Sequence, residues 1–309
     1  MIRGLCSGPA QPSPARQQRL APRQGRHTSS ADQRPHRFRG FHTQNNVGCF
    51  RRATHTAYSL LGRREARLTV QGYYSTKLSG DRLQQCYELA STRVKQYLEA
   101  EIEFVLSRLR PTDSVLELGC GYGRVAFRLA DVAARVVGID TSSESLTLAR
   151  QLARPESRCL FLQMDASALT FGDGTFDVVV CVQNGICAFA LDAVRLVREA
   201  LRVTRPGGRV VFSSYSAGFW PERLQWFESQ AAAGLVGPID YDQTENGTVV
   251  CKDGFRAGTY STEAFRGLCC RLGVEPAVTT VDNSSVFCEI LVRGAAQQRH
   301  PTNNAARCR

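Results

Sequence analysis

Through the middle of the chain, short apolar runs alternate with stretches whose apolar positions recur every three or four residues. The short runs have the composition of buried parallel strands, and the longer stretches have the spacing of amphipathic helices. This alternation predicts an α/β fold with a doubly wound, mostly parallel sheet. The expected strands are 115–118, 135–139, 159–164, 177–182 and 209–214, and the helices between them are 124–134, 142–152 and 191–203.

The pattern changes towards the C-terminus. Residues 273–280 and 285–292 are β-rich runs, and the segment 281–284 between them has the composition of a hairpin turn. A plain dinucleotide-binding sheet would continue with another crossover helix. We therefore expect the sheet to finish with an antiparallel hairpin.

Two further segments flank the predicted sheet. The helical spacing of 83–109 predicts one long helix, and 215–260 is an insertion between the fifth strand and a helix expected from Thr262. Aromatic residues collected in an insertion suit an apolar substrate pocket, and they suit equally well the packing that holds the insertion in place. Those aromatic residues are Phe219, Trp220, Trp226, Phe227, Tyr241 and Phe255.

The first expected strand ends in Glu117, and a turn with the pattern G-x-G-x-G follows it. Glycine lets the backbone pass close to a ligand, and we expect free N–H groups of the helix start to face that ligand. The turn predicts a nucleotide-type cofactor. A dinucleotide fingerprint would place its third glycine at position 124, which is Arg124. The spacing therefore disfavours NAD and favours S-adenosylmethionine.

Acidic residues also end the next two strands. Asp140 lies about 20 residues beyond the first glycine, where a ribose diol would be held by two hydrogen bonds. The third strand ends in Met164-Asp165-Ala166. Carboxyl ends of parallel strands meet at one edge of a sheet, so these acids predict a single ligand site.

At this point residues 85–292, approximately, resemble a class I S-adenosylmethionine-dependent methyltransferase of the small-molecule type. Five motifs follow the order and spacing of that family. They are LELGCGYG at 116–123, GID ending at Asp140, MDA at 164–166, FDVVVCVQNG at 176–185 and LRVTRPGGRVVFSSYS at 201–216. The resemblance implies a Rossmann-like sheet of seven strands, with one strand of the final hairpin inserted antiparallel.

The resemblance also implies a set of site residues. The glycine turn would hold the methionine end of S-adenosylmethionine. The acid after the second strand would bind the ribose, and the acid after the third strand would bind the adenine. The implied cofactor-binding residues are Glu117, Gly119, Cys120, Gly121, Gly123, Asp140, Thr141, Met164, Asp165, Ala166 and Gln183. Asn184 would position the acceptor, and Tyr73 and Tyr74 would help to close the site from N-terminal lid helices at 65–110.

The first 64 residues form a separate segment by composition. They hold twelve arginines, no lysine and one acid, whereas the remaining 245 residues are balanced with 27 basic and 27 acidic side chains. An arginine-rich segment without a long apolar run predicts a targeting segment, with the mitochondrion first and a plastid or the cytoplasm as alternatives. The balanced remainder gives little support to nucleic-acid binding. We expect the domain at 111–294 to be followed by a disordered tail at 295–309.

Other functions remain alternatives. Twelve cysteines without a C-x-x-C pattern predict no metal site, although Cys181, Cys187 and Cys251 could converge on a thiophilic metalloid. A protein or RNA methyltransferase would favour a basic surface or an N-P-P-Y-like loop, and the chain has VQNGI at 182–186 instead. A non-catalytic scaffold would have lost its motif glycines. The acceptor atom (nitrogen, sulfur or oxygen) and the oligomeric state stay open.

Histidine is missing from the whole span 56–299. Histidine is the usual general base near neutral pH, so its absence predicts methyl transfer that relies mainly on proximity and orientation.

Overall fold

The computed structural model describes residues 72–189, 192–245 and 247–294. The chain divides into two units, Met1–Ala66 and Arg67–Arg309, and every described residue belongs to the second. The predicted targeting segment at 1–64, the start of the predicted lid segment and the predicted tail at 295–309 lie outside the described residues. Within the described ranges, no helix is long and apolar enough to cross a bilayer.

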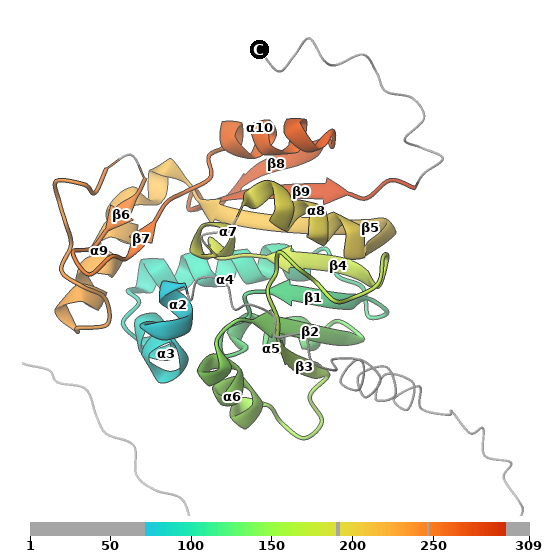
Figure 1. The fold of residues 1–309 in the computed structure, drawn as a ribbon, viewed down its shortest axis with the longest axis horizontal. Coiled ribbons are helices and arrows are strands. Elements are labelled where there is room, and N and C mark those ends of the chain that lie inside the picture. Colours follow the sequence, from blue (N-terminus) through green and yellow to red (C-terminus); the bar gives the residue numbers. More distant parts are fainter. Residues whose placement is uncertain (1–71, 190–191, 246, 295–309) are drawn as a thin grey trace, which may run out of the picture. The chain divides into compact units, whose positions relative to one another are not determined.

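A seven-stranded sheet in the order β3-β2-β1-β4-β5-β9-β8 forms the centre of the unit (Figure 1). Neighbouring strands from β3 to β5 run parallel, and β9 lies antiparallel between β5 and β8. The predicted seven-stranded α/β sheet with its antiparallel C-terminal hairpin is confirmed. The strands are β1 (Ser114–Leu118), β2 (Arg135–Asp140), β3 (Cys159–Gln163), β4 (Phe176–Cys181), β5 (Thr204–Tyr215), β8 (Pro276–Val281) and β9 (Ser285–Leu291).

Helices cover both faces of the sheet. The helices α4, α5 and α6 share one apolar core with the strands, whereas α8 and α10 contact each other and pack on β5 and β8. Right-handed crossovers in opposite directions from β1 and β4 place these two groups on opposite faces. The helices are α2 (Tyr73–Thr76), α3 (Gly80–Glu88), α4 (Thr92–Leu106), α5 (Arg124–Ala130), α6 (Ser143–Leu152), α7 (Gly185–Ala188), α8 (Ala193–Val203), α9 (Trp220–Ala232) and α10 (Thr262–Leu272).

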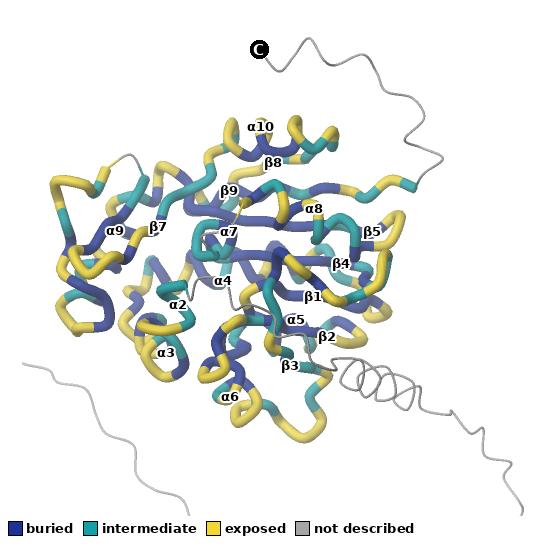
Figure 2. Tube along the Cα trace, viewed as in Figure 1, coloured by how far each residue is buried: buried dark blue, intermediate teal, exposed yellow. Residues whose placement is uncertain are grey.

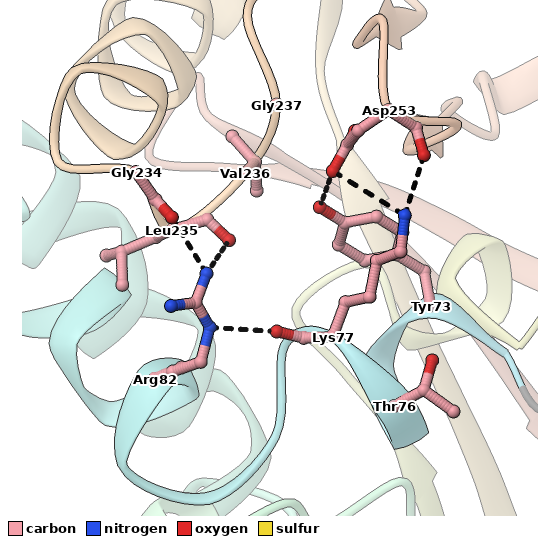
Figure 3. A pocket seen from close by; sticks show the side chains of 9 residues that line it. All are labelled: Tyr73, Thr76, Lys77, Arg82, Gly234, Leu235, Val236, Gly237 and Asp253. Carbon is pink, nitrogen blue, oxygen red and sulfur yellow. Dashed lines mark hydrogen bonds and ion pairs between the residues drawn. The ribbon is translucent and has the colours of Figure 1, made fainter.

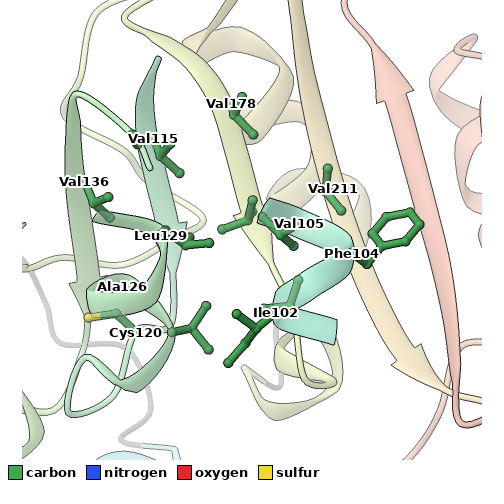
Figure 4. Close-up of a cluster of buried hydrophobic side chains, with 14 of the residues drawn as sticks. Ile102, Phe104, Val105, Val115, Cys120, Ala126, Leu129, Val136, Val178 and Val211 are labelled. Atoms are coloured by element: carbon green, nitrogen blue, oxygen red, sulfur yellow. The ribbon is translucent and has the colours of Figure 1, made fainter. Parts of the chain in front are cut away.

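The core on the α4–α5 face shows why the apolar pattern predicted the sheet. Val115, Val136 and Val178 project from neighbouring strands onto Val105 of α4 and Leu129 of α5, and all five side chains are buried (Figure 4). The central strands are mostly dark in Figure 2, whereas the edge strands β3 and β8 are half-buried or exposed. Other exposed residues gather on the outer sides of the helices and in the loops. Strands buried on both faces read as continuous apolar runs in the sequence.

Three predicted boundaries differ from the structure. The single helix expected at 83–109 is two helices, because the chain turns after α3 and Ser91 caps α4 by accepting a hydrogen bond from Val94 N. The helix expected at 124–134 ends at Ala130. The strand expected from residue 209 begins at Thr204, and within β5 the N–H of Gly207 donates to Val292 O, directly after β9, at 2.8 Å.

The helices α2, α3 and α9 and a small hairpin gather beyond the end to which the parallel strands point (Figure 1). The hairpin pairs β6 (Val249–Val250) with β7 (Arg256–Ala257). Leu78 and Cys86 from the α2–α3 segment share one apolar cluster with Phe227, Cys251 and Phe255 from the insertion. Much of the insertion's aromatic surface is therefore packing against the α2–α3 segment.

Candidate active site

The glycine turn after β1 needs its glycines for conformational reasons. Gly119, Gly121 and Gly123 all have positive φ angles, of 75°, 51° and 87°. The backbone N–H groups are used within the protein, since those of Gly119 and Cys120 both donate to Ile139 O, at 2.8 and 2.9 Å. The free N–H groups expected to face a ligand belong to the start of α5, which follows at Arg124, and that expectation stays a prediction.

Cys120 faces away from the turn. Its side chain is buried in the α4–α5 core, and a Cβ on Gly138 of β2 would lie 2.9 Å from its Sγ. The sequence placed Cys120 among the cofactor-binding residues, but only its backbone lies on the turn. Its thiol belongs to the core.

Glu117 is the buried acid of the site. Its side chain is 4 % exposed, and Oε2 has no hydrogen-bond partner among the described residues. Burial raises the pKa of this carboxyl to about 8, and the nearby Asp140 raises it further while Arg124 opposes the change. An unpartnered buried carboxylate oxygen is complementary to a cationic ligand group.

Asp140 fastens the ends of β1 and β2 to each other. Its Oδ2 accepts from Gly121 N at 2.8 Å, and its Oδ1 accepts from Ser142 N at 2.8 Å. Burial raises the pKa of the Asp140 carboxyl, and these backbone donors oppose that change. Each carboxylate oxygen still has a second lone pair, which a ribose hydroxyl could use. The exposed Thr141 follows directly.

The end of β3 lies beside Asp140. Met164 N donates to Asp140 O at 3.0 Å, which brings the MDA motif to the same edge of the sheet. Asp165 accepts from Ser167 N and Ser167 Oγ at 2.7 and 2.8 Å through Oδ1. Met164 and Asp165 are half-buried and Ala166 is buried. Three of the predicted acids therefore lie at consecutive strand ends.

The turn after β4 is held in an unusual conformation. Gln183 and Asn184 have positive φ angles of 55° and 62° without being glycine. Gln183 N donates to Glu101 Oε2 at 2.6 Å and to Ser213 Oγ at 2.8 Å. The side-chain oxygen of Gln183 accepts from Arg124, which links this turn to the glycine turn. Fixing two residues in the left-handed region costs free energy, so their neighbours must hold them there.

The Asn184 amide is engaged at both ends. Its Nδ2 donates to Gly258 O at 3.1 Å, and its Oδ1 accepts from Ser214 Oγ at 2.7 Å. The side chain is 5 % exposed. It thus connects β5 to the insertion, and the positioning of an acceptor by Asn184 stays a prediction.

Two apolar side chains cover the glycine turn. A Cβ on Gly121 would lie 2.9 Å from Leu83 of α3, and one on Gly119 would lie 2.5 Å from Phe189 next to α7. A side chain at either position would fill the space beside the backbone, which we call the cradle. Glycine keeps this space open so that the backbone can come close to a ligand. The α2–α3 segment, which we call the lid, lies directly over this cradle.

The lid is fastened to the insertion by polar contacts. Tyr73 Oη donates to Asp253 Oδ2 at 2.5 Å, and Lys77 Nζ donates to Asp253 O at 2.8 Å (Figure 3). Arg82 donates to the backbone oxygens of Gly234 and Leu235 at 2.8 and 2.9 Å. A pocket of about 460 Å³ opens between these contacts. Its lining includes Tyr73 but no residue of the glycine turn.

Tyr74 lies on the inner side of the lid. Its ring meets that of Phe255 edge-on, with centroids 5.9 Å apart. Burial raises the pKa of both Tyr73 and Tyr74, so neither phenol is ionised near neutral pH. The two tyrosines fit a role in closing the site and do not fit that of a base.

The three thiols proposed for a metalloid do not form a site. Cys181 is buried in β4, whereas Cys251 belongs to the apolar cluster between lid and insertion. Within the described ranges, no three Cys, His, Asp or Glu side chains are grouped to hold a metal ion. The convergence of Cys181, Cys187 and Cys251 is therefore wrong.

Two residues of the site were not anticipated. Glu101 of α4 supports the turn after β4 from below, and burial raises its pKa to about 7. Arg223 of α9 is completely buried within the insertion. Both lie on helices outside the motifs, and a single charged residue in such a helix gives no sequence signal of burial.

Comparison with known proteins agrees with the geometry. The model of a family described as "Methyltransferase domain" matches residues 115–208. The chain is 35% identical over 131 residues to 2-methyl-6-phytyl-1,4-hydroquinone methyltransferase of Synechocystis sp., covering 40% of this chain and 41% of that protein. It is 38% identical over 144 residues to demethylmenaquinone methyltransferase of Beutenbergia cavernae, covering 44% and 58%. The chain thus spans about half the length of these curated relatives.

A solved structure has the same fold over most of the described unit. The PH0226 protein from Pyrococcus horikoshii OT3 is 26% identical, with a TM-score of 0.53, over 72% of this chain and 98% of that one. These similarities indicate the same kind of domain as the strand order and the glycine turn with its acids. The chain therefore carries a methyltransferase domain with the fold of the class I S-adenosylmethionine-dependent enzymes.

Proposed function

We propose that this protein binds S-adenosylmethionine at the glycine turn and transfers its methyl group to a small-molecule acceptor beneath the lid and the insertion. The observation that carries the proposal is the set of acids at consecutive strand ends around a turn that only glycine can form. Glu117 adds a buried carboxylate oxygen without a partner among the described residues, which suits a cationic cofactor. The named relatives act on hydroquinone or menaquinone precursors, which supports a small acceptor.

The residues present divide into two groups. Glu117, Asp140, Thr141, Gln183 and the segment 164–166 would hold the cofactor beside the glycine turn. When bound, S-adenosylmethionine supplies an electrophilic methyl group on a sulfonium, so that an acceptor lone pair displaces a neutral thioether. The backbone at Asn184 would orient the acceptor, and the lid with Tyr73 and Tyr74 would exclude water.

Mechanistically, we propose that positioning supplies much of the rate. The described residues contain no histidine. The raised pKa values of Tyr73 and Tyr74 leave both phenols protonated. A thiolate, an amine or an ionised hydroxyl already carries the lone pair that attack requires, so alignment is what the protein must add.

A binding and transfer experiment tests the proposal. The full chain is titrated with S-adenosylmethionine, S-adenosylhomocysteine and NAD by calorimetry, and is then incubated with methyl-labelled cofactor and a small-molecule extract. We expect both sulfur compounds to bind, NAD not to bind, and label to enter the small-molecule fraction. Label found only in added protein or RNA would contradict the small-molecule acceptor. Failure to bind the sulfur compounds would contradict the proposal as a whole.

A further inference from the structure

Arg223 is a buried cation inside the insertion. Its side chain is 0 % exposed, and its guanidinium group donates to three backbone oxygens. Nη1 donates to Gly247 O at 2.6 Å, and Nη2 donates to Ala257 O and Gly258 O at 2.8 and 3.1 Å. Nε is buried and has no partner among the described residues. Three of the five guanidinium N–H groups donate in these bonds, and Nε–H is one of the two that remain beside the positive charge.

Aromatic rings enclose the rest of the guanidinium group. Its central carbon lies 4.3 Å from the ring centroid of Tyr215 and 5.7 Å from those of Trp220 and Phe227. Cation–π contacts of this kind stabilise the charge but do not neutralise it. The surroundings are thus attractive to a cation and carry no formal negative charge.

Among the described residues, Arg223 takes part in no ion pair. The titratable groups that act on it most strongly are Tyr215, Cys187, Tyr97 and Tyr74. Burial raises the pKa of each of them, that of Cys187 to about 11, so all four are neutral. A buried charge left without a counter-charge is costly, and an anionic ligand would remove that cost.

The position of Arg223 links it to the proposed acceptor site. Gly258 O accepts from Arg223 and also from Asn184 Nδ2 in the turn after β4. Tyr215 ends β5 at the same edge of the sheet, and Tyr74 of the lid is near enough to act on the charge of Arg223. The cation therefore lies where the turn after β4, the insertion and the lid meet.

We propose that Arg223 binds an oxyanion of the methyl acceptor, so that the substrate is an apolar molecule carrying a carboxylate or an ionised phenol. The inference rests on the proposed function, whose acceptor site it specifies. The aromatic side chains around Arg223 suit the apolar body of such a molecule, and the guanidinium group suits its charged oxygen. A neutral molecule of the same shape would leave the charge uncompensated.

Arg82 provides a matched comparison within the same protein. It also donates to backbone oxygens of the insertion, those of Gly234 and Leu235, but its side chain is exposed (Figure 3). If Arg223 served only to hold the insertion in place, removal of Arg223 or of Arg82 would change ligand binding in the same way. If Arg223 binds an anion, only its removal should abolish the preference of the protein for acidic ligands.

The test uses the full chain saturated with S-adenosylhomocysteine, with binding measured by calorimetry. The probes are 2-naphthoate and 2-naphthol, and the matched neutral compounds are 2-naphthamide and naphthalene. Arg223→Gln, Arg223→Lys and Arg82→Gln are compared with the wild type, and melting temperature and S-adenosylhomocysteine affinity are recorded for each. The two acids separate a carboxylate site from a phenolate site.

We expect the wild type to bind at least one acid about tenfold or more tightly than its neutral counterpart. Arg223→Gln should abolish that preference, Arg223→Lys should retain part of it, and Arg82→Gln should keep it in full. If Arg223→Gln does not fold, Arg223→Lys decides, because a preference that is unchanged from wild type would overturn the proposal. A wild type with no preference for either acid, including one that binds none of the probes, would also overturn it.

The outcomes separate the two proposals. S-adenosylhomocysteine binding without any preference for acids would leave the proposed methyl transfer intact and refute the anion site. A preference for acids that depends on Arg223, without cofactor binding, would refute the proposed function and leave the anion site in place.

Discussion

Replacing Glu117 by glutamine should make the ligand-free protein more stable at alkaline pH and weaken its hold on the cofactor. The carboxyl of Glu117 has an ordinary pKa of 4.5, and burial raises it to about 8 in the folded chain. Between these values the unfolded chain ionises while the folded chain keeps its proton. The contribution of Glu117 to the free energy of unfolding is therefore fully present below the lower pKa, and it is lost as the pH rises from there to the upper pKa.

The magnitude follows from that difference. One pKa unit corresponds to about 1.4 kcal/mol, so ionisation of Glu117 lowers the free energy of unfolding by up to about 5 kcal/mol above its folded-state pKa. Glutamine has nearly the same shape and no charge. We expect Glu117→Gln to exceed the wild type in stability by several kcal/mol at about pH 8.5 and to differ much less at about pH 5.

Urea denaturation at the two pH values measures this, with Glu103→Gln as the control because Glu103 is an exposed residue of the neighbouring helix α4. Titration with S-adenosylmethionine supplies the second reading. A cationic ligand favours the ionised carboxylate, so wild-type affinity should increase with pH up to about 8, and that of Glu117→Gln should not. A variant that is less stable than wild type at alkaline pH, with the same dependence of affinity on pH, would refute the reasoning.

Three further predictions concern other parts of the chain. Asp140→Ala should weaken S-adenosylhomocysteine binding by roughly 2–4 kcal/mol in calorimetry, because the ribose loses two acceptors and the glycine turn loses its anchor; unchanged affinity would place the ribose elsewhere. Removal of residues 1 to about 60 should leave the melting temperature and cofactor affinity intact, since that segment lacks periodic apolar positions; a much lower melting temperature would show that it packs on the domain. Asp253→Asn should speed cofactor release in stopped-flow measurements, because it removes the charge that accepts from Tyr73 and lies 4.0 Å from Lys77 Nζ; release at the wild-type rate would argue against this fastening of the lid.

Features that depend on a particular residue type at a particular position could be predicted from the sequence. Buried strands could be predicted because both faces are covered, and the glycine turn because Gly119, Gly121 and Gly123 adopt positive φ angles. The acid at Asp140 could be predicted from its spacing to that turn. These features depend on residues close together in the chain, so their pattern is visible without the fold.

The parts that could not be predicted depend on tertiary contacts. Glu101 reaches Gln183 across 82 residues, and Arg223 meets Tyr215 and Gly258 only once the insertion has folded back. The break between α3 and α4 was also hidden, because apolar residues continue through Leu89 and Ala90. Only Ser91, a common capping residue, marked the start of a new helix.

The lid is closed in this structure, so part of it must move for the cofactor to enter or leave. Leu83 of α3 lies in front of Gly121, so a ligand that approaches that turn must at least move the Leu83 side chain. The contacts of Tyr73, Lys77 and Arg82 with the insertion are exposed or half-buried, and exposed pairs of this kind contribute about 1 kcal/mol or less each. Leu78 and Cys86, by contrast, are buried against the insertion, and exposing them would cost more. Opening should therefore carry the lid and the adjoining part of the insertion together, which would uncover the cofactor turn and the Arg223 site in one motion.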